Sequence, residues 1–285
     1  MIPLSQRINR LSESETLAMA RKSRELKAQG FDVINLSLGE PGFYTPDNIK
    51  EAARLAIDQN YSFYTPVNGY QELREAISLK LKRDNQLDYT PDQIVVSTGA
   101  KQSIANAVMC LVDPGDEVLV ASPFWVSYRE IIKMAEGTEI LVKADIKHDF
   151  KITARQLEEA ITPKTKLFMF SSPCNPTGSV YSKEELQSLA EVFARHPHVY
   201  ILADEIYEHI VFSGKHESIA QFEAVSDRVI LINGVSKGFA MTGWRVGYMA
   251  AHPEIARACV KLQGQITSGT CSIAQRATLE AMHTD

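Results

Sequence analysis

Short apolar runs that end in polar residues constrain the fold of this 285-residue chain more than any other feature. Val199–Ala203 leads directly into Asp204, and Leu167–Phe170 leads into Ser171 and a proline-rich turn. Val229–Ile232 leads in the same way into an Asn-Gly pair. Apolar runs of this length are typical of parallel strands that are buried on both faces. With helical segments between them, the sequence predicts an α/β fold, a three-layer sandwich around a mostly parallel sheet.

The expected helices and strands alternate along the chain. Helical periodicity predicts helices over Thr16–Gln29, Pro46–Asn60, Gly69–Asn85, Lys101–Val112, Trp125–Ala135, Thr153–Ile161, Ser182–Arg195 and Pro253–Thr267. Strand-like runs cover Ile94–Ser97, Glu117–Ala121, Glu139–Val142, Leu167–Ser171, Val199–Ala203, Val229–Ile232 and Val246–Ala250. Ser182 followed by Glu185 is the pattern of a capping box at a helix start.

Four polar residues follow these strand-like runs at positions suited to a ligand site. Asn175 and Asp204 come after two of the runs, and Lys237 comes after a third. Tyr207 lies three residues beyond Asp204. In open α/β sheets, ligands bind outside the carboxyl ends of the strands. Any one of these side chains is equally explained as a polar cap of a strand end, but together they predict a site at this edge of the sheet.

The segment from Asn233 to Arg245 indicates what such a site binds. A lysine becomes useful in catalysis when a pocket desolvates it or a carbonyl condenses with it, and Lys237 directly follows an apolar run. Arg245, eight residues later, offers a permanent positive charge suited to a phosphate. A partner for an aldehyde and a partner for a phosphate in one short segment describe a pyridoxal-phosphate pocket.

Motifs along most of the chain resemble those of the class I pyridoxal-phosphate aminotransferases, and within them the aspartate aminotransferases typical of bacteria. The matching segments are Leu38–Pro41, Tyr64, Gly99–Gln102, Ser122–Tyr128, Ser172–Gly178, Asp204–Tyr207, Ser236–Lys237 and Met241–Tyr248. Cys174 departs from the family, which usually has asparagine or a similar polar residue at this position.

The resemblance implies a domain organisation. Residues 46–285 are expected to form the large cofactor-binding domain of fold type I. Residues 1–45 are expected to form an N-terminal arm and part of a smaller α+β domain. The C-terminal segment of that smaller domain, with the arginine that grips the substrate's α-carboxylate, is expected to lie beyond the sequence.

Three catalytic residues follow from what the cofactor needs. Lys237 is expected to hold the cofactor's aldehyde as a Schiff base and then to move a proton on the substrate. Asp204 is expected to keep the pyridine nitrogen protonated, because a buried carboxylate raises the pKa of that nitrogen. Tyr207, with Asn175, is expected to donate to the phenolic oxygen. The alternative for Tyr207 is an aromatic that packs on the sheet.

The rest of the cofactor is expected to be held by a helix start and an aromatic ring. Amides at a helix start, together with the helix dipole, attract a phosphate, and hydroxyls and a cation complete the site. The residues expected there are Gly99, Ala100, Lys101, Ser236 and Arg245. Trp125 is expected to stack on the pyridine face, the alternative being a core tryptophan. Ser122-Pro123 and Asn175-Pro176 are candidates for cis peptide bonds.

The family resemblance also implies a second subunit and a substrate. Tyr64 is expected to reach the phosphate from a neighbouring subunit, in a homodimer with shared active sites. In this branch, a lysine after the phosphate-loop glycines binds the side-chain carboxylate, helped by a serine near the N-terminus. Lys101 and Ser14 occupy those positions, although Lys101 could instead be a solvated lysine at a helix start. The full set of residues expected at the substrate is Gly39, Trp125, Asn175, Lys101 and Ser14.

The main functional hypothesis is therefore an enzyme that transfers an amino group from L-aspartate to 2-oxoglutarate by a ping-pong route. An aminotransferase for a related substrate such as prephenate stays open. So does a fragment that binds pyridoxal phosphate or a partner without turnover, as in regulators built on the same fold. The complete set of cofactor residues argues against a degenerate enzyme, and no DNA-binding helical arm is recognisable.

Composition argues against several other classes. A net charge of −5 gives no electrostatic basis for binding nucleic acid or a membrane surface. No apolar stretch approaches the roughly 20 residues needed to span a bilayer, and the N-terminus lacks the apolar core of a signal peptide. Four widely spaced cysteines, Cys110, Cys174, Cys259 and Cys271, predict free thiols in a reducing compartment, so a cytoplasmic location is expected. The seven histidines show no metal-ligand spacing, and no metal site is expected.

Overall fold

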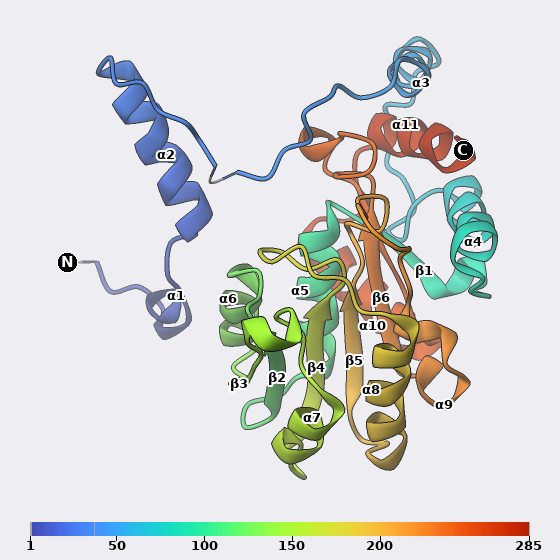
Figure 1. Cartoon of the computed structure of the whole chain (residues 1–285). Helices are drawn as coiled ribbons and strands as arrows, with labels where there is room; N and C mark the ends of the chain where they lie inside the picture. The colour runs from blue at the N-terminus through green and yellow to red at the C-terminus, as the bar shows by residue number, and fades with distance from the viewer. Residues whose placement is uncertain (1, 37, 285) are drawn as a thin grey trace.

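A mixed sheet forms the centre of the protein in the computed structural model, which describes residues 2–36 and 38–284 (Figure 1). Over these residues the sheet has seven strands in the order β1-β7-β6-β5-β4-β2-β3. The strands are β1 Ile94–Ser97, β2 Glu117–Ser122, β3 Thr138–Lys143, β4 Thr165–Ser171, β5 Tyr200–Asp204, β6 Val229–Gly234 and β7 Gly247–Ala250. Only β7 runs antiparallel to its neighbours β1 and β6. The predicted α/β fold with a mostly parallel sheet is confirmed.

Helices cover both faces of the sheet. One face is covered by α5 Ala100–Leu111, α6 Ser127–Met134 and α10 Pro253–Ile266. The other is covered by α4 Gln71–Asn85, α7 Ala154–Ala160, α8 Lys183–Arg195, α9 Glu223–Ser226 and α11 Ser272–His283, with α3 Asp47–Asp58 packed on α11. The protein therefore has the three layers that the sequence predicts.

Alternation along the central strands explains how one sheet serves two cores. In β4, Leu167 and Met169 point into the core with α5, α6 and α10, whereas Phe168 and Phe170 point into the core on the opposite face. All four side chains are buried, because successive residues of a strand face opposite sides. This is why the strand is apolar along its whole length.

The helix boundaries follow local capping chemistry. At the start of α8, the Ser182 hydroxyl accepts a hydrogen bond from the Glu185 N–H, and the Glu185 carboxylate accepts one from the Ser182 N–H. The predicted capping box is therefore present, and it satisfies two N–H groups that the helix itself leaves unpaired.

Three α-helices were given no range from the sequence. α11 is one, and α1 Gln6–Arg10 and α9 are the other two. The buried face of α11 is formed by Ala274, Gln275, Ala277, Thr278, Ala281 and Met282. Small and polar residues give a weak hydrophobic periodicity, so this buried helix carries little of the signal that identifies amphipathic helices.

The N-terminal part of the chain lies apart from the sheet. α1 and α2, Glu15–Ala28, project to one side of the molecule, and an extended segment leads from them to α3 (Figure 1). The Ser12 N–H donates to the Glu130 carboxylate of α6 at 2.8 Å, but many apolar side chains here are exposed. Within the described residues, no helix has the length and apolar character needed to cross a membrane.

The strand β6 and the antiparallel strand β7 place one connection at the carboxyl edge of the sheet. Gly234, the last residue of β6, pairs with Gly247, the first residue of β7. The segment 235–246 between them therefore leaves and re-enters the sheet at the same point. Because β7 runs antiparallel, the residues before it lie beside those that follow the parallel strands.

Candidate active site

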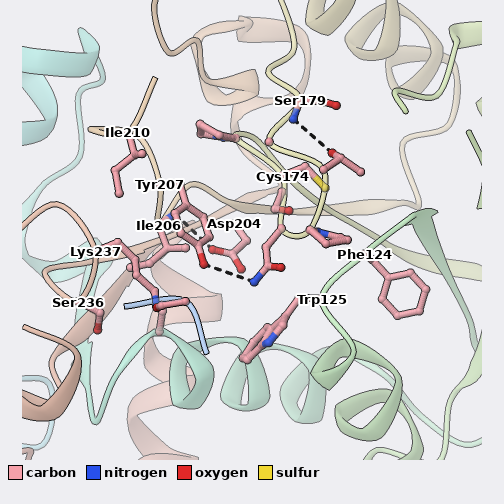
Figure 2. A pocket seen from close by; sticks show the side chains of 18 of the residues that line it. Phe124, Trp125, Cys174, Ser179, Asp204, Ile206, Tyr207, Ile210, Ser236 and Lys237 are labelled. Atoms are coloured by element: carbon pink, nitrogen blue, oxygen red, sulfur yellow. Dashed lines mark hydrogen bonds between the residues drawn. The ribbon is translucent and has the colours of Figure 1, made fainter. Parts of the chain in front are cut away.

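A cavity of about 1030 Å³ opens at the carboxyl edge of the sheet. Its walls come from the segments that follow β2, β4, β5 and β6 and from the start of α5 (Figure 2). Ten of the residues predicted for the site line it: Gly39, Ala100, Lys101, Trp125, Asn175, Asp204, Tyr207, Ser236, Lys237 and Arg245. Residues as far apart in the chain as Trp125 and Lys237 are brought together, because the carboxyl ends of parallel strands share one edge, and Gly39 comes from the N-terminal arm.

Three predicted residues do not line the cavity. Gly99 lies beneath Arg245, next to the wall. Ser14 precedes α2 and is half-exposed, whereas Thr16 of the same helix does reach the cavity. The side chain of Tyr64 is fully exposed, at 100%. In this single chain, Ser14 and Tyr64 are therefore not part of the pocket.

Lys237 is half-buried on the connection that follows β6. Its Nζ donates a hydrogen bond to the Gly39 carbonyl and lies 5.8 Å from the centre of the Tyr207 ring. Burial lowers the pKa of Lys237, the Glu40 carboxylate opposes this, and the charge of Arg245 lowers the pKa further. A lowered pKa raises the fraction of neutral amine, which is the form that reacts with a carbonyl.

Asp204 is the last residue of β5 and only 5% exposed. The Tyr128 hydroxyl donates to its Oδ2 at 2.6 Å, and the Ile206 N–H donates to its Oδ1 at 3.3 Å. Burial raises the pKa of Asp204 to about 6, and the two hydrogen bonds oppose this rise. A buried carboxylate of this kind favours a nearby positive group or N–H donor, because such a partner offsets the loss of hydration.

Tyr128 was not singled out as a site residue from the sequence. It is fully buried in α6, three residues after Trp125, and the two rings meet edge to face at 5.7 Å. Burial, and then the Asp204 charge, raise the pKa of Tyr128 well above its ordinary value, so the hydroxyl stays a donor. Trp125 lies just before α6 and Tyr128 lies in its first turn, so a spacing of three residues brings the two rings together.

Asn175 and Tyr207 meet across the cavity. The Asn175 side-chain amide donates to the Tyr207 hydroxyl at 3.3 Å, and Figure 2 shows this bond with Asp204, Lys237 and Trp125 around the same space. Burial and the charge of Asp204 raise the pKa of Tyr207. The bonds Ser122-Pro123 and Asn175-Pro176 are cis, as predicted, and Ser172-Pro173 is also cis.

The start of α5 forms a cradle with Arg245. Gly99 has a φ of +82°, and a Cβ there would overlap the Arg245 guanidinium, so a glycine is required on both counts. Behind it, a Cβ on Gly247 would overlap the Ala100 amide nitrogen. The first N–H groups of a helix have no intrahelical partner, and here they lie beside a guanidinium. This combination suits a phosphate or another small anion.

Lys101 lies on the side of the cavity formed by Trp125. Its Nζ is 4.8 Å from the centre of the Trp125 ring. Although much of Lys101 is exposed, the protein around its ammonium lowers its pKa, and the charge of Arg245 adds to this. A cation over an aromatic face leaves its other donors free for an anionic ligand.

Comparisons with known proteins identify the family. The family model of aminotransferase class I and II matches residues 32–285. The aspartate/prephenate aminotransferase of Cereibacter sphaeroides is 50% identical over 281 residues, which are 98% of this chain and 70% of that protein. A bifunctional aspartate aminotransferase and glutamate/aspartate-prephenate aminotransferase of Petunia hybrida is 47% identical over 99% of this chain and 59% of its own length.

Solved structures show the same fold. The aspartate aminotransferase of Thermus thermophilus with maleate superposes with a TM-score of 0.96 at 42% identity, over 99% of this chain and 73% of that chain. The aspartate aminotransferase of Rhizobium meliloti gives a TM-score of 0.96 at 41% identity, over 100% and 72% of the two chains. The match of the family model, the identity to these relatives and the shared fold show that this chain is an aminotransferase and belongs to the aminotransferase class I and II family.

Proposed function

We propose that the protein binds pyridoxal phosphate and transfers an amino group from L-aspartate to 2-oxoglutarate. The observation that carries the proposal is the meeting, in one cavity, of a half-buried amine, a buried carboxylate and an anion cradle. These are Lys237, Asp204 and the start of α5 with Arg245. The named activities of the relatives, aspartate and aspartate/prephenate aminotransferases, support this choice of substrate.

The residues present fit each part of this cofactor. The Gly99 cradle, Ser236 and Arg245 would hold the phosphate, because the glycine lets the Arg245 guanidinium lie close to the start of α5. Asp204 would pair with the pyridine nitrogen, Asn175 and Tyr207 would bind the phenolic oxygen, and Trp125 would stack on the ring. When bound, the cofactor supplies an electron sink for the carbanion formed at the substrate's Cα.

The protein's own contribution to the reaction centres on two residues. The amine of Lys237 would bind the aldehyde and, once released, would carry the proton removed from the substrate's Cα. Asp204, already oriented by Tyr128 and Ile206, would stay charged opposite the pyridine nitrogen. A single lysine serves both halves of the exchange, so the first product must leave before the second substrate binds.

Lys101 supports a dicarboxylate substrate. Its ammonium lies at the cavity beside Trp125, where it would bind a side-chain carboxylate. Gly39, on the N-terminal arm, lies next to Lys237. Prephenate is the second candidate, because the relative at 50% identity is named for both substrates. The apolar side chains of Leu36, Leu38 and Phe124 also line the cavity, where they would accommodate a ring.

A second subunit and the N-terminal arm would supply Tyr64 and Ser14. The fully exposed Tyr64 would reach the phosphate of a neighbouring copy in a homodimer, and Ser14 would approach the substrate when the arm closes on the site. The exposed apolar side chains of the arm would be covered in such an assembly. The four cysteines are free thiols, which suits the cytoplasmic location that we propose.

Initial-rate kinetics test the proposal. With L-aspartate and 2-oxoglutarate both varied, double-reciprocal plots should give parallel lines, and prephenate should replace 2-oxoglutarate as the amino acceptor if it is also a substrate. Intersecting lines would indicate a sequential mechanism and contradict the proposed use of one lysine. A protein that binds the cofactor but turns over no amino acid would support the alternative of binding without catalysis.

A further inference from the structure

Residues of the turn that follows β5 face either the cavity or the protein interior. Asp204 and Tyr207 line the cavity. Glu205 and Glu208, each next to one of them, are not among the lining residues and are buried, with exposures of 2% and 9%. Two carboxylates inside a protein must be compensated, so their partners show what holds this turn from behind.

Glu208 is held by α4. Lys80 Nζ donates to its Oε1, and the Asn85 amide donates to its Oε2 at 2.8 Å. Lys80 also donates to the Asn85 oxygen at 2.9 Å, so the three side chains form a closed group. The side chains of the ion pair are only 3% and 5% exposed. Lys80 of α4 and Glu208 after β5 are 128 residues apart in the chain, and their ion pair joins the two segments.

Glu205 is held by the segment after the turn. The Ser218 hydroxyl donates to its Oε1 at 2.6 Å, and His216 Nε2 lies 2.9 Å from its Oε2. Burial alone lowers the pKa of His216, but the Glu205 carboxylate raises it above its ordinary value. The segment between the turn and His216 contributes Ile210, Phe212 and Ser213 to the cavity wall. Glu205 therefore fixes both the turn and a neighbouring part of the wall.

The turn also contacts the segment that carries Lys237. His209, next to Glu208, lies 3.3 Å from its Oε1 and meets the Phe239 ring edge to face at 5.5 Å. Gly238 gives this ring its space, because a Cβ there would lie 2.6 Å from the His209 Cδ2 atom. The direction of the turn is thus coupled to the residue directly after Lys237.

We propose that Glu205 and Glu208 are positioning residues that fix the directions of Asp204 and Tyr207. The inference rests on the proposed function, in which these two residues bind the cofactor. A buried ion pair is weak evidence for stability, because desolvation offsets the attraction of the charges. These contacts instead orient the turn, since each of the two carboxylates accepts two or more directed hydrogen bonds next to a residue of the site. Small displacements of catalytic groups reduce rates strongly.

Two variants and one control test the inference in the cofactor-loaded protein. The double variant Lys80→Met/Glu208→Met removes both charges but keeps similar side-chain volumes, and Glu205→Gln keeps a partner for Ser218. Arg228→Met is the control. Arg228 is buried at the opposite end of β5 and β6, where it donates to the carbonyls of Phe193, His196 and Val199.

The readouts are kcat, KM for the amino acid, and the pH at which the visible absorbance of the bound cofactor changes. Both test variants should lower kcat by about 10- to 100-fold with little change in KM. They should also shift the absorbance titration by at least about half a pH unit, because the groups around the cofactor move. Arg228→Met should lower the melting temperature without such a shift.

Unchanged kcat and an unchanged titration in the test variants would overturn the inference alone. The same titration shift in Arg228→Met would also overturn it, because the effect would then follow general stability. A wild-type protein that shows no absorbance of bound cofactor would overturn the proposed function, and this inference with it.

Discussion

The carboxyl edge of the sheet and the described part of the N-terminal arm, residues 2–36 and 38–45, differ in what holds their side chains in place. At the sheet edge, Asp204 is fixed by Tyr128 and by the turn that follows it, and the surrounding strands are buried. On the arm, large apolar side chains such as Leu4, Leu17 and Ile34 are exposed. The described part of the arm contacts the body through Ser12 with Glu130 of α6, and near its end through Gly39 with Lys237 and Thr45 with the Ala240 carbonyl.

This difference indicates which part of the site a single chain forms without a second subunit. The residues proposed to bind the cofactor lie on strand ends and the start of α5, so their geometry follows from the sheet and its two cores. Two further proposed residues, Ser14 for the substrate and Tyr64 for the cofactor's phosphate, lie on segments whose surroundings a second subunit would supply. Substitutions of cofactor-binding residues at the sheet edge should therefore act on chemistry, and substitutions of residues that bind the substrate or come from a second subunit should act on affinity.

The largest effect is expected for Lys237→Ala. It should abolish turnover and the visible absorbance of the cofactor bound through its aldehyde, because no amine remains for the aldehyde. Some cofactor should stay bound through the phosphate cradle, which equilibrium dialysis would detect. Lys101→Ala is the matched control and should keep the absorbance. If Lys237→Ala keeps it, another lysine binds the aldehyde, and the central assignment at the sheet edge is wrong.

Asp204→Asn should come next. The fold should persist, but turnover should fall by orders of magnitude, since an amide cannot hold the pyridinium proton and the electron sink weakens. Steady-state kinetics together with a thermal melt would measure this. Asp227→Asn, at an exposed carboxylate outside the cavity, is the control. A near-wild-type rate with native-like cofactor binding would remove Asp204 from the mechanism.

Lys101→Ala should act on affinity rather than on chemistry. KM for aspartate should rise by about 10- to 150-fold, which corresponds to the 1.5–3 kcal/mol typical of a hydrogen bond to a charged group. KM for alanine should change much less, because alanine has no side-chain carboxylate. An equal loss for all amino-acid donors would show that Lys101 acts on the cofactor or the fold.

The smallest effect is expected for Tyr64→Phe. Loss of one hydrogen bond to the phosphate should weaken cofactor binding by about 2- to 12-fold. The effect should appear only at protein concentrations at which the dimer forms, because Tyr64 is fully exposed in the single chain. Fluorescence titration of the cofactor across a dilution series would measure it. The same weakening in the monomer would show that Tyr64 belongs to the site of its own subunit, and it would contradict the proposed role of a second subunit.

The sequence predicted the sheet and its polar edge because both depend on local patterns. The β5 run is apolar throughout and ends at Asp204, so burial and the strand end coincide in a few adjacent residues. The strands lie within a few residues of their predicted bounds. The placement of Asp204 and Lys237 at one edge then follows from parallel pairing, which needs no knowledge of individual contacts.

Features that depend on tertiary packing were not predictable in this way. The buried face of α11 includes Gln275, whose side chain bonds to the Tyr70 N–H and to Thr65 and Thr270, partners far away in the chain or outside the helix. The pair of Lys80 and Glu208 likewise joins residues that look like ordinary charges on a helix and a loop. Their burial is decided by the fold, not by neighbouring residues, so no short pattern reveals it.

The return of the chain into the sheet at Gly234 and Gly247 has a consequence for motion. The connection 235–246 is fixed at both ends by strand pairing, and Val235, Met241 and Val246 within it are fully buried. Local opening of this segment would therefore break part of the core, which makes its free energy close to that of global unfolding. Lys237 thus lies on a firmly held segment of the chain. Any closure over a bound substrate has to come from the opposite side, from the arm that carries Gly39 and from the 210–213 wall.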